Sequence, residues 1–413
     1  MSAGSLAFIA AVAASVGIEL WLTHRQIRTV LTHRDAVPAA FAGSFSLEEH
    51  RKAADYTIAR ARLHRIETML DALLTLALTL GGGIAMIDAL WRGTGWPQPW
   101  LGLAVIASVA AALAALSLPL SLWRTFRLEA RFGFNRTTPV LFLVDLGKSV
   151  LLAVLLAGPL VLLVLFVMQH AGRWWWAWFW CVWLAVSLLL SWAWPAFIAP
   201  LFNRFSPLAD DSLRTRLEAL LTRCGFSSSG VFVVDGSKRS SHGNAYFTGL
   251  GRHKRIVFFD TLLQQLGAAE IEAVLAHELG HFRLGHIRQR LIVSGGIALL
   301  ALAAFGWLAG RPGFYRTLGV PLASPHAALL LLVLVAPVLL FFLSPLSALW
   351  SRLHEFSADR FAATHASASE LATALAKLYR DNANTLTPDA WYVAFHYSHP
   401  PALERIRRLG GAT

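Results

Sequence analysis

The sequence predicts a mainly α-helical protein that crosses a membrane several times and carries one larger α+β segment in water. Of its 413 residues, 56% are hydrophobic and only 15% are charged, a balance too apolar for an ordinary soluble domain. The apolar residues gather in seven long stretches, and basic residues alternate between the loops that join them. These observations favour one integrated membrane body over a soluble domain with a membrane tail.

Each of the seven stretches is long enough to cross about 30 Å of hydrocarbon as a helix. The predicted spans are 4–23, 68–90, 100–120, 149–168, 174–198, 289–310 and 326–349. No Lys or Arg precedes the first stretch. We therefore predict a first helix that stays in the membrane and is not a cleaved signal peptide.

The loops between these stretches predict the topology. Those after the first, third, fifth and seventh spans are rich in Lys and Arg, whereas the others hold only Arg92, Arg173, Arg311 and Arg316. Because basic loops remain in the cytoplasm, the N-terminus is predicted outside, and residues 199–288 and the C-terminus inside. These loops account for the net charge of +12. No nucleic-acid recognition module accompanies them, so we expect no nucleic-acid partner.

The segment 199–288 is the main water-soluble element. Apolar residues recur at helical spacing over 211–224. Short strands are predicted at 230–235 and 255–260, with a third at 244–248, because β-branched and aromatic residues there lie between turn-forming residues. A helix over 269–285 follows. Neither cysteine of the chain has a partner at metal-ligand spacing, so a Cys-based zinc site is not expected.

This last helix contains the pattern His277-Glu278-Leu279-Gly280-His281. Residues four apart lie on one face of a helix, so His277 and His281 can put two imidazoles on one metal ion. Glu278, one step round the helix, is placed to hold a water molecule and not the metal. Two solvated histidines on a surface helix are the simpler alternative. The pattern predicts a zinc site with a general base beside it.

A zinc hydrolase needs a third protein ligand and an open position. The two spans after the motif helix form a hairpin, which returns the chain to the same side of the membrane. There it presents Glu355 and Asp359, again four residues apart. We expect one of them to bind zinc and the other to hydrogen-bond a ligand imidazole.

At this point the chain resembles the Ste24-type prenyl-protein endopeptidases, or type I CaaX proteases, of the M48 metallopeptidase group. The resemblance runs along nearly the whole chain. The motifs that carry it are "FGFNRTTP" (132–139), "PLFNRFSPL" (200–208), "DGSKRSSHGNAYFTGLG" (235–251), "KRIVFFDTLL" (254–263), "HELGH" (277–281), "EFSAD" (355–359) and "HYSHPP" (396–401). Position 357 is Ser, where many members of the family carry Gln.

The resemblance implies a role for each site residue. The zinc ligands would be His277, His281 and Glu355, with Glu278 as the general base and Asp359 as the acid behind a ligand. Asn244 and Ala245 fall in the segment that offers an edge strand to the substrate backbone. His399 and Arg405 match a tail segment that closes over the site, with His399 stabilising the oxyanion and Arg405 contacting the substrate.

The resemblance also implies a fold: seven tilted helices ringing an internal, water-filled chamber, with a zincin-like α+β metalloprotease region at its cytosolic end. We expect four regions. They are an N-terminal region of five spans (1–198), a cytoplasmic catalytic region (199–288), spans six and seven (289–349), and a C-terminal region with the third ligand (350–413).

The expected activity is zinc-dependent hydrolysis of peptide bonds, with one Zn²⁺ per chain, that removes the C-terminal tripeptide of prenylated CaaX proteins. One alternative is quality control of misfolded or non-prenylated membrane proteins, and another is a transporter or receptor with a structural metal. The Ala- and Arg-rich composition suggests a bacterial source and therefore the inner membrane.

Five other ionisable residues are left with less specific expectations. His242 is either part of the substrate segment or a surface histidine, and His286 is expected to be solvated at a helix end. Asp145 and Lys148 are expected at the edge of the fourth span. Glu19, near the cytoplasmic end of the first span, either faces a chamber or reaches the interface.

Overall fold

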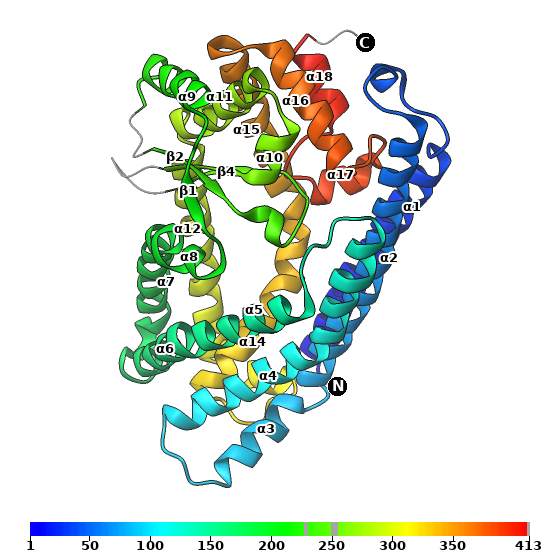
Figure 1. Cartoon of the computed structure of the whole chain (residues 1–413). Coiled ribbons are helices and arrows are strands. Elements are labelled where there is room, and N and C mark those ends of the chain that lie inside the picture. Colours follow the sequence, from blue (N-terminus) through cyan, green and yellow to red (C-terminus); the bar gives the residue numbers. More distant parts are fainter. Residues whose placement is uncertain (227–229, 249–254, 411–413) are drawn as a thin grey trace.

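The computed structural model describes residues 1–226, 230–248 and 255–410. Long helices form an elongated cage, and the small sheet with its covering helices lies at one end of it (Figure 1). The helices of the cage are α1 (Ala3–Thr32), α2 (Leu47–Leu78), α3 (Gly83–Arg92), α4 (Trp100–Trp123), α5 (Pro139–Leu152), α6 (Gly158–His170), α7 (Trp175–Ala193), α12 (His286–Ala309), α14 (Pro325–Leu340) and α15 (Ser344–His365). Six helical runs among the described residues are long and apolar enough to cross a membrane. A seventh results if α2 and α3 count as one bent span.

The second predicted span, 68–90, is not one helix. α2 ends at Leu78, and α3 begins at Gly83 after a bend of 49°. Three consecutive glycines, Gly81 to Gly83, lie at this break, and Gly82 has a φ of 78°. A left-handed residue ends an α-helix, so the chain turns where hydropathy alone predicts a continuous helix.

The fourth span is longer than predicted. It runs over 139–170, with a short π-helical stretch at Ala153–Ala157 between α5 and α6. Asp145 and Lys148 therefore lie within the span and not at its edge. Arg239 donates to both oxygens of Asp145 at 2.8 and 3.0 Å, and the Lys148 ammonium donates to the carbonyl of Leu201 at 2.7 Å. These partners compensate two charges that would otherwise be costly at this depth.

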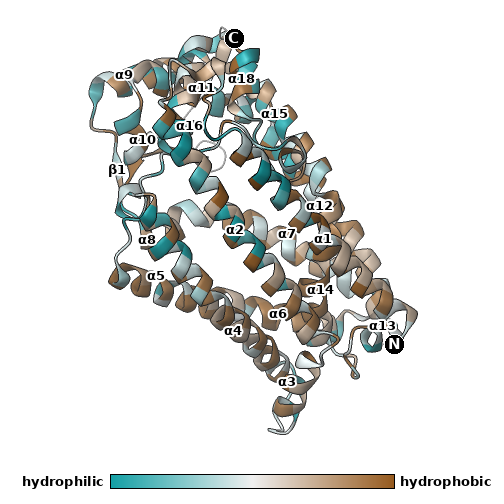
Figure 2. Ribbon diagram, turned by 90° about the vertical axis from the view of Figure 1, so that its right-hand side faces the viewer, coloured by the Kyte–Doolittle hydropathy of each residue, from teal (hydrophilic) through white to brown (hydrophobic). Residues whose placement is uncertain are grey.

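The membrane helices bury little of their surface against one another. Only 11% to 28% of the most apolar window of each span is buried inside the protein. Most of the surface of each span is therefore left for contact with lipid or with the space between the helices. Figure 2 shows hydrophobic ribbon concentrated along α3 to α6 and α14, with hydrophilic segments gathered toward α9, α10 and α16.

Glu19 faces the interior of this arrangement. It is 7% exposed and lies 2.7 Å from His64 Nε2 on α2 and 3.3 Å from His396 Nε2. The sequence left open whether Glu19 faces the interior or reaches the membrane interface, and the structure shows that it faces the interior.

The sheet has the order β1-β2-β4-β3, with β1 at Phe205–Pro207, β2 at Val231–Val234, β3 at Ala245–Thr248 and β4 at Arg255–Phe259. β2 and β4 are parallel, and the two outer strands pair antiparallel to them. The sequence predicted three of the strands. It missed β1, whose three residues include a proline, a residue that sheets accept at an edge.

Helices α9 (Asp211–Arg223), α10 (Asp260–Gln265), α11 (Ala268–Arg283) and α16 (Ala368–Asp381) surround this sheet, followed by α17 (Ala390–His396) and α18 (Ala402–Arg408). Their shared core includes Leu217, Leu220, Phe258, Leu275 and Leu279. Because α11 packs on this core along nearly its whole length, the face that carries the histidine pattern is held rigidly.

Candidate metal centre

α11 begins with a capping interaction and then presents the histidine pattern. Glu270 accepts a hydrogen bond from the backbone N–H of Gly267 at 2.7 Å, which satisfies a free donor at the helix start. His277 and His281 follow on one face, with ring centroids 4.9 Å apart. His277 is 6% exposed, so these are not the solvated histidines of the simpler alternative.

Gly280 allows α15 to approach this face. A Cβ atom at position 280 would lie 3.0 Å from the Cα of Ala358 and 3.2 Å from its carbonyl oxygen. These are backbone atoms of α15, which cannot move aside cheaply. The contact brings Glu355, one helical turn before Ala358, next to the two imidazoles.

Three groups from the two helices can hold one metal ion. His277 Nε2 and His281 Nε2 are 3.2 Å apart. His277 Nε2 lies 3.4 Å from Oε2 of Glu355, and His281 Nε2 lies 3.2 Å from Oε1 of the same carboxylate. The edges of a tetrahedron with zinc–ligand distances of about 2.0–2.1 Å are about 3.3 Å long. The carboxylate oxygen Oε2 of Glu355 is buried without a hydrogen bond. Donor type, spacing and this orphaned oxygen all fit zinc.

Asp359 and Arg405 lie behind His277. The His277 Nδ1–H group donates to Asp359 at 2.9 Å, and Arg405 donates to both oxygens of Asp359 at 2.9 and 2.6 Å. Arg405 is 5% exposed and lies 3.6 Å from Glu355. Burial lowers the pKa of His277, but its hydrogen bonds to Asp359 and Glu355 outweigh this and raise the pKa to about 9.

His286 lies behind the second histidine, where sequence reasoning did not place it. It is 6% exposed, its Nδ1 is 3.0 Å from His281 Nδ1, and its Nε2 is 3.2 Å from the hydroxyl of Ser357. His354 stacks on it with ring centroids 4.0 Å apart. The expectation of a solvated helix-end residue was therefore wrong. Gly285, with a φ of 72°, makes the turn that brings His286 back to the site.

Glu278 and His399 face the same site from different sides. The Glu278 carboxylate has no hydrogen bond or ion pair with any residue that the structure describes, and burial raises its pKa. His399 keeps 63% of its side chain exposed, and its Nε2 lies 3.4 Å from Glu355. The Glu278 carboxylate can therefore exchange a proton, and the His399 imidazole can donate a hydrogen bond to a bound molecule.

Neither Asn244 nor Ala245 has a hydrogen bond or ion pair with the metal ligands in the part of the chain that the structure describes. Ala245 begins β3, the outer strand of the described sheet. Phe259 donates to the carbonyl of Asn244 at 3.0 Å, so the backbone groups of Asn244 point to β4. Because antiparallel strands alternate, those of Ala245 and Phe247 point away from β4. The N–H of Ala245 is held by the Asn244 side chain at 2.8 Å.

Comparisons with known proteins agree with this arrangement. Residues 26–204 match the model of the "CAAX prenyl protease N-terminal, five membrane helices", and residues 207–413 match the model of "Peptidase family M48". The chain belongs to peptidase family M48. The two family models meet where the last of the first five spans ends and the sheet begins.

Relatives in the family are similar over most of their length. A CAAX prenyl protease 1 homolog of Arabidopsis thaliana is 34% identical over 404 residues, covering 95% of this chain and 94% of the relative. CAAX prenyl protease 1 of Saccharomyces cerevisiae is 38% identical over 311 residues, covering 71% and 68%. The crystal structure of S. mikatae Ste24p superposes with a TM-score of 0.91 at 31% identity, over 99% of both chains.

Family membership confirms three predictions made from the sequence. The protein is a multi-pass membrane zinc metalloprotease, its fold is mainly helical with six or seven apolar helices, and its protease region is of mixed α+β type. The transporter alternative is therefore discarded. A peptide or protein is the class of substrate that an M48 peptidase cleaves.

Proposed function

We propose that this protein removes the C-terminal tripeptide of prenylated CaaX proteins, with one zinc ion held by His277, His281 and Glu355. The observation that carries the proposal is the cluster of His277, His281 and Glu355, in which one ligand atom from each residue lies within 4.8 Å of the other two. The Glu278 carboxylate beside it has no hydrogen bond with any described residue. The substrate class is supported by the names of relatives that cover most of this chain.

A zinc ion held by these residues would supply Lewis acidity, which would polarise the scissile carbonyl and lower the pKa of water toward neutrality. Glu278 takes the proton from the attacking water and later delivers it to the leaving amine. Its raised pKa suits both steps, because a weak acid accepts the proton and can then give it up.

His399 is proposed to donate a hydrogen bond to the oxygen that becomes negative in the transition state. Its exposure and its position 3.4 Å from Glu355 support this role. Asp359 is proposed to fix the orientation of His277, and Arg405 to hold Asp359. The resemblance led us to expect Arg405 against the substrate, but its burial and its two bonds to Asp359 favour the positioning role.

The substrate is proposed to bind as an additional strand along β3. The outward-facing backbone carbonyl of Ala245 and the exposed side chain of Asn244 support this assignment. Main-chain hydrogen bonds hold an extended peptide without demanding a particular side chain. Such pairing would present the scissile carbonyl in a fixed register.

We infer the topology from the loop charges: the N-terminus outside, and the catalytic region and C-terminus in the cytoplasm, in the inner membrane of a bacterium. The four regions 1–198, 199–288, 289–349 and 350–413 are kept as functional divisions. The boundary between the two family models, at 204–207, supports the first of them.

The test is cleavage of a farnesylated CaaX peptide and of the same peptide without the farnesyl group. Purified protein in detergent should release one intact tripeptide from the farnesylated peptide, and do so faster than from the unmodified one. Mass spectrometry of the products gives the cleaved bond. Equal rates with several internal cuts in both peptides would contradict the proposal and favour the quality-control alternative.

A further inference from the structure

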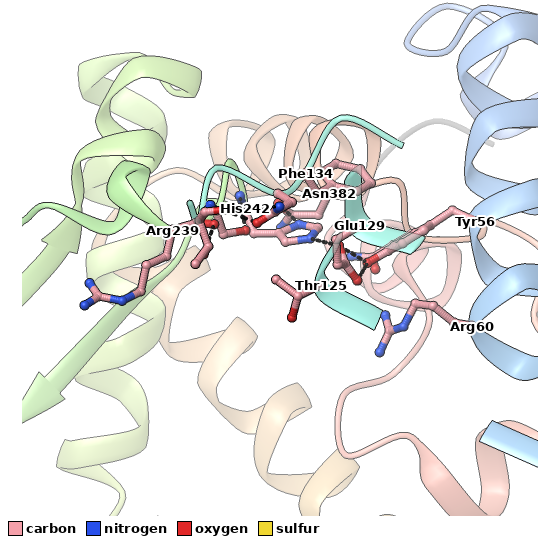
Figure 3. Close-up of a pocket in the computed structure, with 12 residues that line it drawn as sticks. Tyr56, Arg60, Thr125, Glu129, Phe134, Arg239, His242 and Asn382 are labelled. Carbon is pink, nitrogen blue, oxygen red and sulfur yellow. Dashed lines mark hydrogen bonds and ion pairs between the residues drawn. The ribbon is translucent and has the colours of Figure 1, made fainter. Parts of the chain in front are cut away.

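A polar pocket lies where the membrane region meets the protease region. Its volume is about 450 Å³, within the range of sites for small ligands. α2 contributes Tyr56 and Arg60, and the π-helical stretch after α4 (η2, Arg124–Glu129) contributes Glu129. His242 and Asn382 close it from the protease side (Figure 3).

This pocket adjoins the start of β3. Asn382, in the turn after α16, accepts from the backbone N–H of Gly243 at 3.1 Å and donates to the carbonyl of Gly243 at 3.4 Å. His242 stacks on Phe134 with ring centroids 4.3 Å apart. The segment that leads into Asn244 is thus held on both sides, and its His242 forms part of the pocket wall.

The direction of a paired substrate decides which end reaches this pocket. Along the free edge of β3, an antiparallel peptide runs toward the strand's N-terminal end as it approaches its own C-terminus. A residue opposite Ala245, followed by two more, brings the peptide's end beside Gly243 and His242. Three extended residues span about 10 Å. A tripeptide whose first residue pairs with Ala245 therefore ends at the pocket.

The charges of the pocket suit an anion at that end. Arg239 is occupied by Asp145, and Figure 3 shows its side chain turned away from the others. Glu129 accepts from the Tyr56 hydroxyl at 2.8 and 3.0 Å and faces His242 Nε2 at 3.7 Å. Its charge is thus partly compensated.

Arg60 is different from these charged neighbours. Unlike Arg239, it has no ion pair with any residue that the structure describes, although its charge interacts with that of the nearby Glu129. Its guanidinium lies over the Tyr56 ring, 5.5 Å from the centroid. The exposed side chain of Asn384, which also lines the pocket, is a further donor without a hydrogen bond in the described structure.

We propose that this pocket binds the free α-carboxylate at the C-terminus of the substrate, with Arg60 as the cation and Asn384 as an additional donor. The proposal rests on the proposed function and explains how the length of the released peptide is set. A peptide whose carboxylate is held by Arg60 and whose backbone pairs with β3 is cut at a fixed distance from its end.

Two matched farnesylated peptides test this inference, one with a free C-terminal carboxylate and one with a C-terminal amide. The wild type should show a kcat/KM about 10- to 100-fold higher for the acid, the range expected for hydrogen bonds to a charged group. Arg60→Gln should lower kcat/KM for the acid by the same factor and change that for the amide less than about twofold. Arg60→Lys should recover part of the loss.

Arg62→Gln is the matched control, because Arg62 is exposed on the same helix and does not line this pocket. It should leave both rates unchanged. Unchanged amide cleavage by Arg60→Gln would also show that this variant is folded and active.

The inference is overturned if the wild type cleaves acid and amide equally, or if Arg60→Gln slows both alike, while the tripeptide is still released. That result leaves the proposed function intact. Internal cuts without release of a tripeptide from either peptide would instead contradict the proposed function, and the subsite with it.

Discussion

Asp359→Asn tests the proposed support of the metal ligands. The carboxylate of Asp359 accepts three hydrogen bonds, one from His277 and two from Arg405, all at 2.6–2.9 Å. Asparagine has nearly the same shape but one acceptor oxygen and no charge. Its amide N–H₂ would face a donor, either the guanidinium or the imidazole N–H.

The structure sets the size of the effect. Arg405 is 5% exposed, and removal of Asp359 leaves Glu355, 3.6 Å away, as its nearest anion. Breaking a buried pair typically costs about 3–5 kcal/mol of folding free energy, at the lower end where a second anion remains. A lost partner of a ligand imidazole typically weakens metal binding about 10- to 100-fold.

The assay is zinc affinity by competition with a chromophoric chelator, together with thermal unfolding in detergent, for Asp359→Asn, Arg405→Gln and the double variant. Because the two residues bind each other, the double variant should lose less stability than the two single losses added, by about 1–3 kcal/mol. Additive losses with unchanged zinc affinity in all three variants would refute the positioning role.

Three further predictions concern other residues in or beside the metal centre. Gly280→Ala should weaken zinc binding at least about tenfold, because the new Cβ meets the α15 backbone at 3.0 Å and pushes Glu355 away; wild-type affinity would contradict this. His286→Ala should weaken zinc binding about 10- to 100-fold, and His286→Gln less, as measured by chelator competition; equal loss in both would indicate a packing role alone. Since the pKa of metal-free His277 is raised to about 9, this residue holds a proton at pH 7 that zinc must displace. Zinc binding at pH 7 should therefore release about one proton from His277, and affinity should rise with pH up to about 9; calorimetry in buffers of different ionisation enthalpy measures this, and no release would contradict it.

Local patterns in the sequence were sufficient for much of the site. His277 and His281 are four apart on one helix, so their convergence follows from helix geometry. Glu355 could be expected because a two-span hairpin must return the chain to the same side. The hydropathy of the chain likewise predicted the membrane class and seven spans, of which six are single helical runs among the described residues and the seventh is the bent pair α2 and α3.

What the sequence did not predict depends on turns and long-range contacts. His286 is five residues from His281, a spacing that no helix face brings together, and only the left-handed Gly285 reverses the chain. The burial of Arg405 depends on Asp359, which lies 46 residues away. The true start of the fourth span at 139 was hidden because Asp145 interrupts the apolar run, and Arg239, its partner, is remote in sequence.

The most direct test of the central claim compares the wild type with Glu278→Gln for both metal content and peptide cleavage. The account predicts about one zinc ion per chain in each protein, and a loss of kcat of at least about 10²- to 10⁴-fold in the variant. The substitution leaves the three proposed ligands in place but removes the base. Undiminished cleavage by Glu278→Gln, or a wild type without bound metal, would contradict the account.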